Sequence, residues 1–222
     1  MTQRRLRSAR WDADAVRDEV RSYVVEHLGT PDGVPIVDET GFLRKGDQSA
    51  GVQRQYTGAA GRRENAQVGV FLSYASLRGR ALADRRLYLP EQTWCRDAGR
   101  RSHSGIPASV GFATKSRLAG QMIVAALAAG IAAHWVTGGE VYGQDPHLRA
   151  TLEKSGVGYV LTVACSSRVK VNTDRTTMRA DYVAARFRPR SGSDTVPKSV
   201  RRARTTAIGH GWRPAPSSTR DC

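Results

Sequence analysis

The first residue whose type and position could serve chemistry is Asp38. It follows Val34-Pro35-Ile36-Val37, a short apolar run suited to a buried strand, so a carboxylate is predicted at the C-terminal end of that strand. Glu39 comes next, and because adjacent strand residues point to opposite faces, we expect it to neighbour the site without joining it. The alternative for an isolated aspartate such as Asp38 is that it caps the following turn.

Residues 41–65 follow this carboxylate and are rich in glycine, arginine, lysine and glutamine with little periodicity. We therefore predict a long exposed loop, and ordered loops of this length are usually functional. Its cations, its amide donors and the ring of Tyr56 suit contacts to phosphates and stacking on bases. The candidate DNA-binding residues in it are Arg44, Lys45, Arg54, Gln55, Tyr56, Arg62 and Arg63. For each of them, the alternative is an ordinary solvated surface residue.

The overall charge points to the same kind of partner. The chain carries 35 lysines and arginines against 20 acids, a net charge of +15, which favours a polyanion such as DNA or RNA. The alternative is a GC-rich genome that encodes many arginines on a solvated surface. Three widely spaced cysteines without a C-x-x-C pair fit a reducing cytoplasm. No signal peptide or convincing membrane span is visible, so no membrane partner is expected.

The elements that would position these residues can be predicted from periodicity and turn signals. Residues 12–28 predict an amphipathic helix that ends at Gly29, and residues 66–75 and 80–89 predict an antiparallel hairpin. A helix over 122–129, a strand over 133–137, a helix over 145–154 and a strand over 158–164 follow. This order predicts an α/β fold, a mixed sheet flanked by helices in a ribonuclease H-like arrangement.

The C-terminal part of the chain has a different composition. After Phe187, arginine, serine, threonine and proline dominate, which predicts a disordered basic tail over 187–222. The tail is either a nucleic-acid-binding arm, carrying Arg201, Arg202 and Arg204, or unselected sequence read in a lost frame. The expected organisation is therefore an N-terminal helical segment over 1–33, an incomplete core over 34–186, and this tail.

Several segments together carry a resemblance to a known family. They are Asp38-Glu39-Thr40-Gly41-Phe42, Arg54-Gln55-Tyr56, Gln67-Val68-Gly69-Val70, Phe112-Ala113-Thr114-Lys115, Trp135-Val136-Thr137-Gly138, Glu140-Val141-Tyr142-Gly143 and Tyr159-Val160-Leu161. The pattern, which covers roughly residues 8–186, resembles the bacterial insertion-sequence transposases of the DDE class, which are DDE superfamily endonucleases with a ribonuclease H-like core.

The resemblance implies metal-dependent DNA cleavage and strand transfer at the ends of an insertion sequence. In this class three acids hold Mg²⁺ or Mn²⁺, and paired ions about 3.5–4 Å apart activate the nucleophile and stabilise the leaving oxygen. Asp38 matches the first acid and is the expected metal ligand. The implied partner is DNA at transposon ends, in the bacterial cytoplasm and near the nucleoid, and a homodimer is a further possibility. Tyr142 could stack near the cleavage site or pack beneath the sheet.

The sequence departs from the family pattern at the other two acids. The second acid stands immediately before E-V-Y-G, where this chain has Gly139. Glu140 could replace it only if the strand end bends, because a shift of one residue normally reverses the direction of a side chain. The third acid has no counterpart, and Asp181 precedes the helix expected to carry it. We therefore predict a catalytically defective copy, truncated or frameshifted, or alternatively a non-catalytic DNA-binding protein derived from a transposase.

Overall fold

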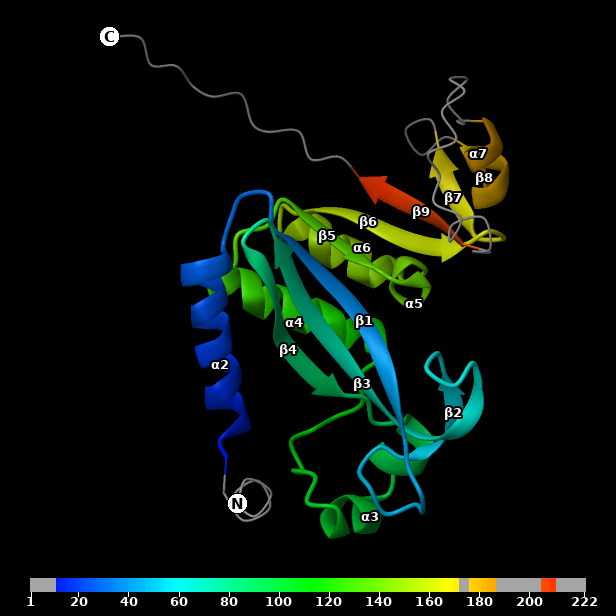
Figure 1. Cartoon of the computed structure of the whole chain (residues 1–222). Coiled ribbons are helices and arrows are strands. Elements are labelled where there is room, and N and C mark those ends of the chain that lie inside the picture. Colours follow the sequence, from blue (N-terminus) through cyan, green and yellow to red (C-terminus); the bar gives the residue numbers. More distant parts are fainter. Residues whose placement is uncertain (1–10, 172–175, 187–204, 211–222) are drawn as a thin grey trace.

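A computed structural model describes residues 11–171 and 176–186, and the backbone of 205–210 (Figure 1). The helical elements are α2 (Ala13–Tyr23), which continues into a wider helical turn η1 (Val24–Leu28), η2 (Glu91–Cys95), α3 (Ala98–His103), α4 (Lys115–Ala128), α5 (Glu140–Gly143), α6 (Pro146–Lys154) and α7 (Ala180–Arg186). The strands are β1 (Val34–Leu43), β2 (Gln53–Thr57), β3 (Arg62–Ser76), β4 (Gly79–Leu87), β5 (Trp135–Gly138), β6 (Gly158–Ala164), β7 (Arg168–Val171), β8 (Thr176–Arg179) and β9 (Thr205–His210).

Seven of these strands form one mixed sheet. Its order is β2-β3-β1-β5-β6-β9, and β4, off this path, pairs with the part of β3 that follows its pairing with β2. β1, β3 and β4 are antiparallel, whereas β1, β5 and β6 run parallel. A meander of three antiparallel strands followed by two parallel strands, each reached through a helix, is the ribonuclease H-like arrangement expected from the sequence. The fold prediction is confirmed.

The core lies on one face of this sheet. α4 packs behind β3 and β4 (Figure 1), and its Met122 and Ile123 are fully buried in one cluster with Val37 of β1 and Leu72 of β3. Since strand side chains alternate, Asp38 lies on the opposite, exposed face of β1. Burial of the odd-numbered positions therefore fixes the direction of the candidate acid.

The N-terminal helix α2 packs against β4. The Asp12 carboxylate caps α2 by accepting hydrogen bonds from the backbone N–H groups of Asp14 and Ala15, each at 3.0 Å. Farther along the helix, Arg21 forms an ion pair with Asp84 of β4, whose side chain is fully buried. A register shift in β4 makes Ala83 an extra residue between its paired neighbours. None of the described helices is long and apolar enough to cross a membrane.

Several expectations about boundaries need correction. β1 is ten residues long, so Asp38 stands in the middle of a strand and not at its end. The region 41–65 is not one long loop, because β1 runs to Leu43, and β2 and the first part of β3 form a two-stranded ribbon. α4 begins at Lys115, seven residues before the expected start, because the Thr114 hydroxyl caps it by accepting from the N–H of Arg117.

The expectation of a disordered tail does not hold for six of its residues. Residues 205–210 form β9, which pairs with β6 along its whole length, from Ala164↔Thr205 to Tyr159↔His210. The pairing covers the outer edge of β6 with backbone hydrogen bonds. The other residues of the predicted tail, including Arg201, Arg202 and Arg204, lie outside the described residues.

Candidate active site

The candidate site lies where the parallel pairing of β1 and β5 ends. Val37 is paired with Gly138, and the next residues along the two strands are Asp38 and Gly139. A Cβ atom built on Gly139 would lie 3.6 Å from Oδ1 of Asp38. Gly139 has a φ of −68°, which any residue can adopt. An acid at position 139 would therefore place a second carboxylate beside the first, whereas glycine provides none.

Gly139 also stands at the N-cap of α5. Its residue type provides no side-chain cap for the helix, whereas aspartate is among the preferred capping residues. Glu140, which we considered as a substitute acid, is the first residue of α5. Its Oε1 accepts a hydrogen bond of 3.0 Å from Nε2 of Gln144, one helical turn farther on. Glu140 thus lies in the helix, engaged with a residue of its own turn.

Asp181, the remaining candidate acid, belongs to a different part of the molecule. It is the second residue of α7, which packs against β8 and β9. Both of its oxygens accept hydrogen bonds from the Arg179 guanidinium, at 3.1 and 2.7 Å, and this pairing lowers the pKa of the Asp181 carboxyl. Across residues 11–171 and 176–186, no group of three or more His, Cys, Asp or Glu residues is placed to hold a metal ion.

Behind Asp38, three of the motif segments meet at one cluster. Glu39 lies on the opposite side of β1 from Asp38. Its Oε1 accepts a hydrogen bond of 3.1 Å from Nζ of Lys115 at the start of α4, and the two side chains form an ion pair. Tyr142 of α5 is fully buried beside them, and its hydroxyl has no hydrogen-bond partner in the described part of the chain. Burial, and then the nearby Glu39 carboxylate, raise the pKa of that hydroxyl. Of the two roles considered for Tyr142, the structure shows packing, so its ring cannot stack on a base.

The glycines of the E-V-Y-G and W-V-T-G segments have a packing role. A Cβ on Gly143 would lie 1.9 Å from the carbonyl oxygen of Thr162, so α5 rests directly on the backbone of β6. A Cβ on Gly138 would lie 2.7 Å from Cγ1 of Val37. Both contacts are far closer than real Cβ atoms permit. They hold the N-terminus of α5, and with it position 139, against the middle of β1.

A second candidate surface is the ribbon formed by β2 and the first part of β3. Tyr56 pairs with Arg63, and Arg54 pairs with Asn65, so these side chains share one face of the ribbon. By strand alternation, this face continues along β3 to Phe71, which pairs with Asp38. The exposed residues Arg54, Tyr56 and Arg63 therefore lie on the same face of the sheet as Asp38.

The other predicted DNA-binding residues differ in how far they are already engaged. Arg62 points to the opposite face and pairs with Glu64 at 2.6 Å. Gln55 is half-buried and donates to the carbonyl of Ala66, and Arg44 donates to Oε1 of Gln67. Among the described residues, Lys45, Arg54 and Arg63 make no ion pair. Arg44, Gln55 and Arg62 thus make contacts within the fold. The charges of Lys45, Arg54 and Arg63 have no acidic partner among the described residues.

No pattern in the sequence predicted the unit that holds the region 41–65 in place. Trp94 of η2 forms a small satellite core with Val52 and Leu89, and its indole Nε1 donates to the carbonyl of Val52 at 2.8 Å. The Arg100 guanidinium stacks 3.9 Å from the centre of the Trp94 ring and donates to the carbonyl of Asp47. The apolar residues Leu89, Trp94 and Ile106 are five and twelve residues apart, which is too irregular to signal a helix. The basic loop is therefore anchored through its carbonyl groups.

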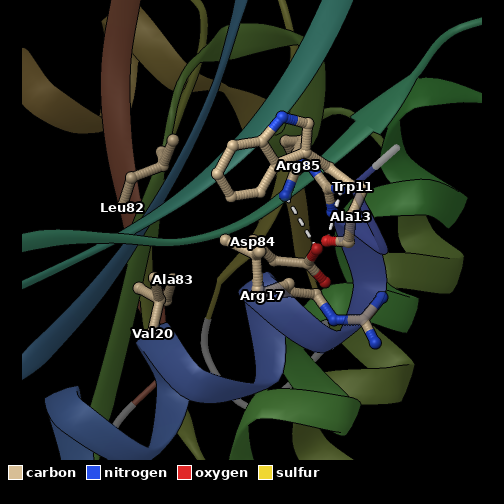
Figure 2. Close-up of a pocket in the computed structure, with 9 residues that line it drawn as sticks. Trp11, Ala13, Arg17, Val20, Leu82, Ala83, Asp84 and Arg85 are labelled. Atoms are coloured by element: carbon tan, nitrogen blue, oxygen red, sulfur yellow. Dashed lines mark hydrogen bonds between the residues drawn. The ribbon is translucent and has the colours of Figure 1, made fainter. Parts of the chain in front are cut away.

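A pocket between α2 and β4 provides a contrast with these surfaces. The pocket has a volume of about 310 Å³. Figure 2 shows Trp11, Val20 and Leu82 among the residues that line it, together with Arg17 and Arg85. Both cations are already engaged, because Arg17 pairs with acids of α2 and Arg85 donates to the carbonyl of Ala13. Its polar groups therefore serve the attachment of α2.

The fold and the site together define the class of protein. A ribonuclease H-like sheet with an acid in the middle of β1 and a facing position at the end of β5 is the framework of a metal-dependent nuclease of phosphodiester bonds. The family model of the DDE superfamily endonucleases matches residues 2–215, and the chain belongs to that family. The match extends past Arg186, where we expected the resemblance to end. No curated protein matches the chain.

Proposed function

We propose that this chain is a transposase-derived DNA-binding protein that holds DNA at insertion-sequence ends without cutting it. The observation that carries the proposal is the position of Gly139, whose missing side chain would begin 3.6 Å from the Asp38 carboxylate. Family membership supports a nuclease or transposase ancestry and a DNA substrate. The change from acid to glycine supports the loss of cleavage.

The residues present do not fit the metal ions of the family. Paired Mg²⁺ or Mn²⁺ ions need carboxylates from several directions, because the ions repel each other and compete with water for ligands. Asp38 provides two oxygens at most, and Oδ1 already accepts a hydrogen bond of 2.8 Å from the N–H of Glu39. Glu39 is neutralised by Lys115 on the other side of the strand. No catalytic step is therefore assigned to this chain.

The DNA-binding part of the proposal is supported by the ribbon face. Arg54 and Arg63 are exposed cations that flank Tyr56, whose side chain is 62% exposed. Guanidinium groups suit phosphate oxygens, and an exposed ring suits the face of a base. Because the face is continuous with that of Asp38, DNA bound to the ribbon would pass over the former catalytic position. The setting implied by the family is DNA in the bacterial cytoplasm.

The test is a nicking assay on a supercoiled plasmid that carries the ends of the insertion sequence, with Mg²⁺ or Mn²⁺. The wild-type chain should bind the plasmid and leave it supercoiled. Gly139→Asp alone should also fail to nick, because the third acid is still missing. Asp38→Ala controls for a contaminating nuclease. Nicking by the wild-type chain that disappears in Asp38→Ala would show that the ancestral enzyme is still active.

A further inference from the structure

The structure contains a further cleft, which lies outside both the ribbon and the candidate site. It has a volume of about 660 Å³ and lies between the end of β4, the loop 104–113 and the first turns of α4. Its walls include Leu87 and Leu118, and the ring of Phe112, which is 40% exposed. The size is that of a pocket for one small organic group and not for a double helix.

Two arginines give this cleft its charge. Arg86 of β4 and Arg117 of α4 both line it and are both exposed, and neither makes an ion pair or a side-chain hydrogen bond within the part of the chain that the structure describes. This distinguishes the cleft from the pocket of Figure 2, whose arginines are engaged. No acidic residue lines the cleft. Its free charge is therefore complementary to an anion.

From this combination we infer that the cleft binds an unpaired nucleotide at a DNA end. The Phe112 ring would stack on the base, and Arg86 and Arg117 would contact the phosphates on either side of it. A paired base within a duplex cannot enter, because its faces are covered by neighbouring bases. The inference rests on the proposed function for the presence of DNA, and it adds which form of DNA is preferred.

The first turn of α4 sets the position of the cleft relative to β1. Arg117 and Lys115 belong to the same first turn of α4. Lys115 reaches Glu39, the residue next to Asp38. The cleft is thus linked by one helical turn to the side of β1 that faces away from Asp38, so a strand held in the cleft lies on the other face of the sheet from the candidate site.

The experiment compares a blunt duplex with the same duplex carrying a short single-stranded overhang that contains 2-aminopurine. The wild-type chain should bind the overhang DNA more tightly and quench the 2-aminopurine fluorescence, because stacking on an aromatic ring favours binding by about tenfold or more per base. Arg86→Gln combined with Arg117→Gln should remove that preference. Phe112→Leu should remove the quenching and leave blunt-duplex binding unchanged.

The matched control is Arg80→Gln, an exposed arginine on the same strand that does not line the cleft. It should keep both the preference and the quenching. Equal affinity for the two DNAs without quenching would overturn the inference and leave the proposed function standing. Failure to bind either DNA would overturn both. Circular dichroism of each variant establishes that the fold is retained.

Discussion

Two buried tyrosine hydroxyls differ in how they are satisfied. The Tyr74 hydroxyl accepts from the N–H of Thr30 and lies within hydrogen-bond distance of the carbonyls of Thr30 and Ala132, at 3.1 and 3.2 Å. The Tyr142 hydroxyl is equally buried and has no partner among the described residues. A buried hydroxyl without a partner loses its hydrogen bonds to water and gains nothing in return. The two residues should therefore respond in opposite ways to loss of the hydroxyl.

Tyr142→Phe should leave the free energy of unfolding unchanged or raise it by up to about 1 kcal/mol, whereas Tyr74→Phe should lower it by about 1–3 kcal/mol. The pKa of the Tyr142 hydroxyl is raised in the folded state. Titration of this hydroxyl therefore leaves the free energy of unfolding unchanged below the unfolded pKa of about 10, and lowers it as pH rises above that value. Urea unfolding at neutral and alkaline pH measures both effects. Equal losses in the two variants would contradict this view of Tyr142.

At the residue scale, the sequence predicted Asp38 and Gly139 as the positions of the first two acids, and the structure places these two residues beside each other. The strand register then placed Glu39 on the opposite side from Asp38, as expected from alternation. Tyr142 could not be assigned from sequence, because a tyrosine in a polar motif suits a base or a core equally well. Only the packing of α5 on β6 decides between them.

At the scale of elements, the ion pair between α2 and β4 carries a large energetic consequence. The Asp84 side chain is fully buried, and it accepts hydrogen bonds from Arg21 and from the N–H of Arg85. Nε of Arg21 is buried without a partner among the described residues. A buried pair of this kind stabilises little by itself, but removing one partner leaves an uncompensated charge in the interior.

Arg21→Met should therefore lower the free energy of unfolding by about 3–5 kcal/mol, and the double variant with Asp84→Leu should recover most of that loss. Arg17→Met is the matched control, because Arg17 pairs with acids that remain exposed, and it should cost less than about 1 kcal/mol. Chemical denaturation of the wild type, Arg21→Met, Asp84→Leu and the double variant provides the cycle. A double variant as unstable as Arg21→Met would show that the pair itself stabilises the fold.

Helices and strands could be predicted from the sequence where apolar residues repeat at regular spacing. They could not be predicted where only backbone hydrogen bonds to a neighbouring strand define the element. The hairpin of β3 and β4, the strands β5 and β6, and the helix α6 follow from periodicity and turn signals. β2 was missed because its alternation is of polar residues, Gln53, Arg54, Gln55 and Tyr56, held by backbone pairing with β3. β9 was missed for the same reason, since its pairing with β6 is a tertiary contact.

At the scale of the whole molecule, the charge of +15 predicts DNA binding that depends strongly on salt. The slope of log affinity against log salt should be roughly −0.9 for each phosphate that is neutralised. Combining Arg54→Gln with Arg63→Gln should reduce the slope by about 2. Arg62→Gln, adjacent in sequence but paired with Glu64 on the opposite face, should change it little. A salt-independent affinity, or equal effects of the two changes, would exclude the ribbon as the DNA surface.

The central claim is that position 139 is where this protein lost the second ligand of its metal site, and a Mn²⁺ titration tests it most directly. Mn²⁺ binding is measured by calorimetry for the wild-type chain, Gly139→Asp and Gly139→Ala, each with and without Asp38→Ala. Gly139→Asp should gain one site at least about tenfold tighter than any in the wild-type chain, and Asp38→Ala should abolish it. Gly139→Ala should gain none. An equally tight site in the wild-type chain that requires Asp38 would contradict the account.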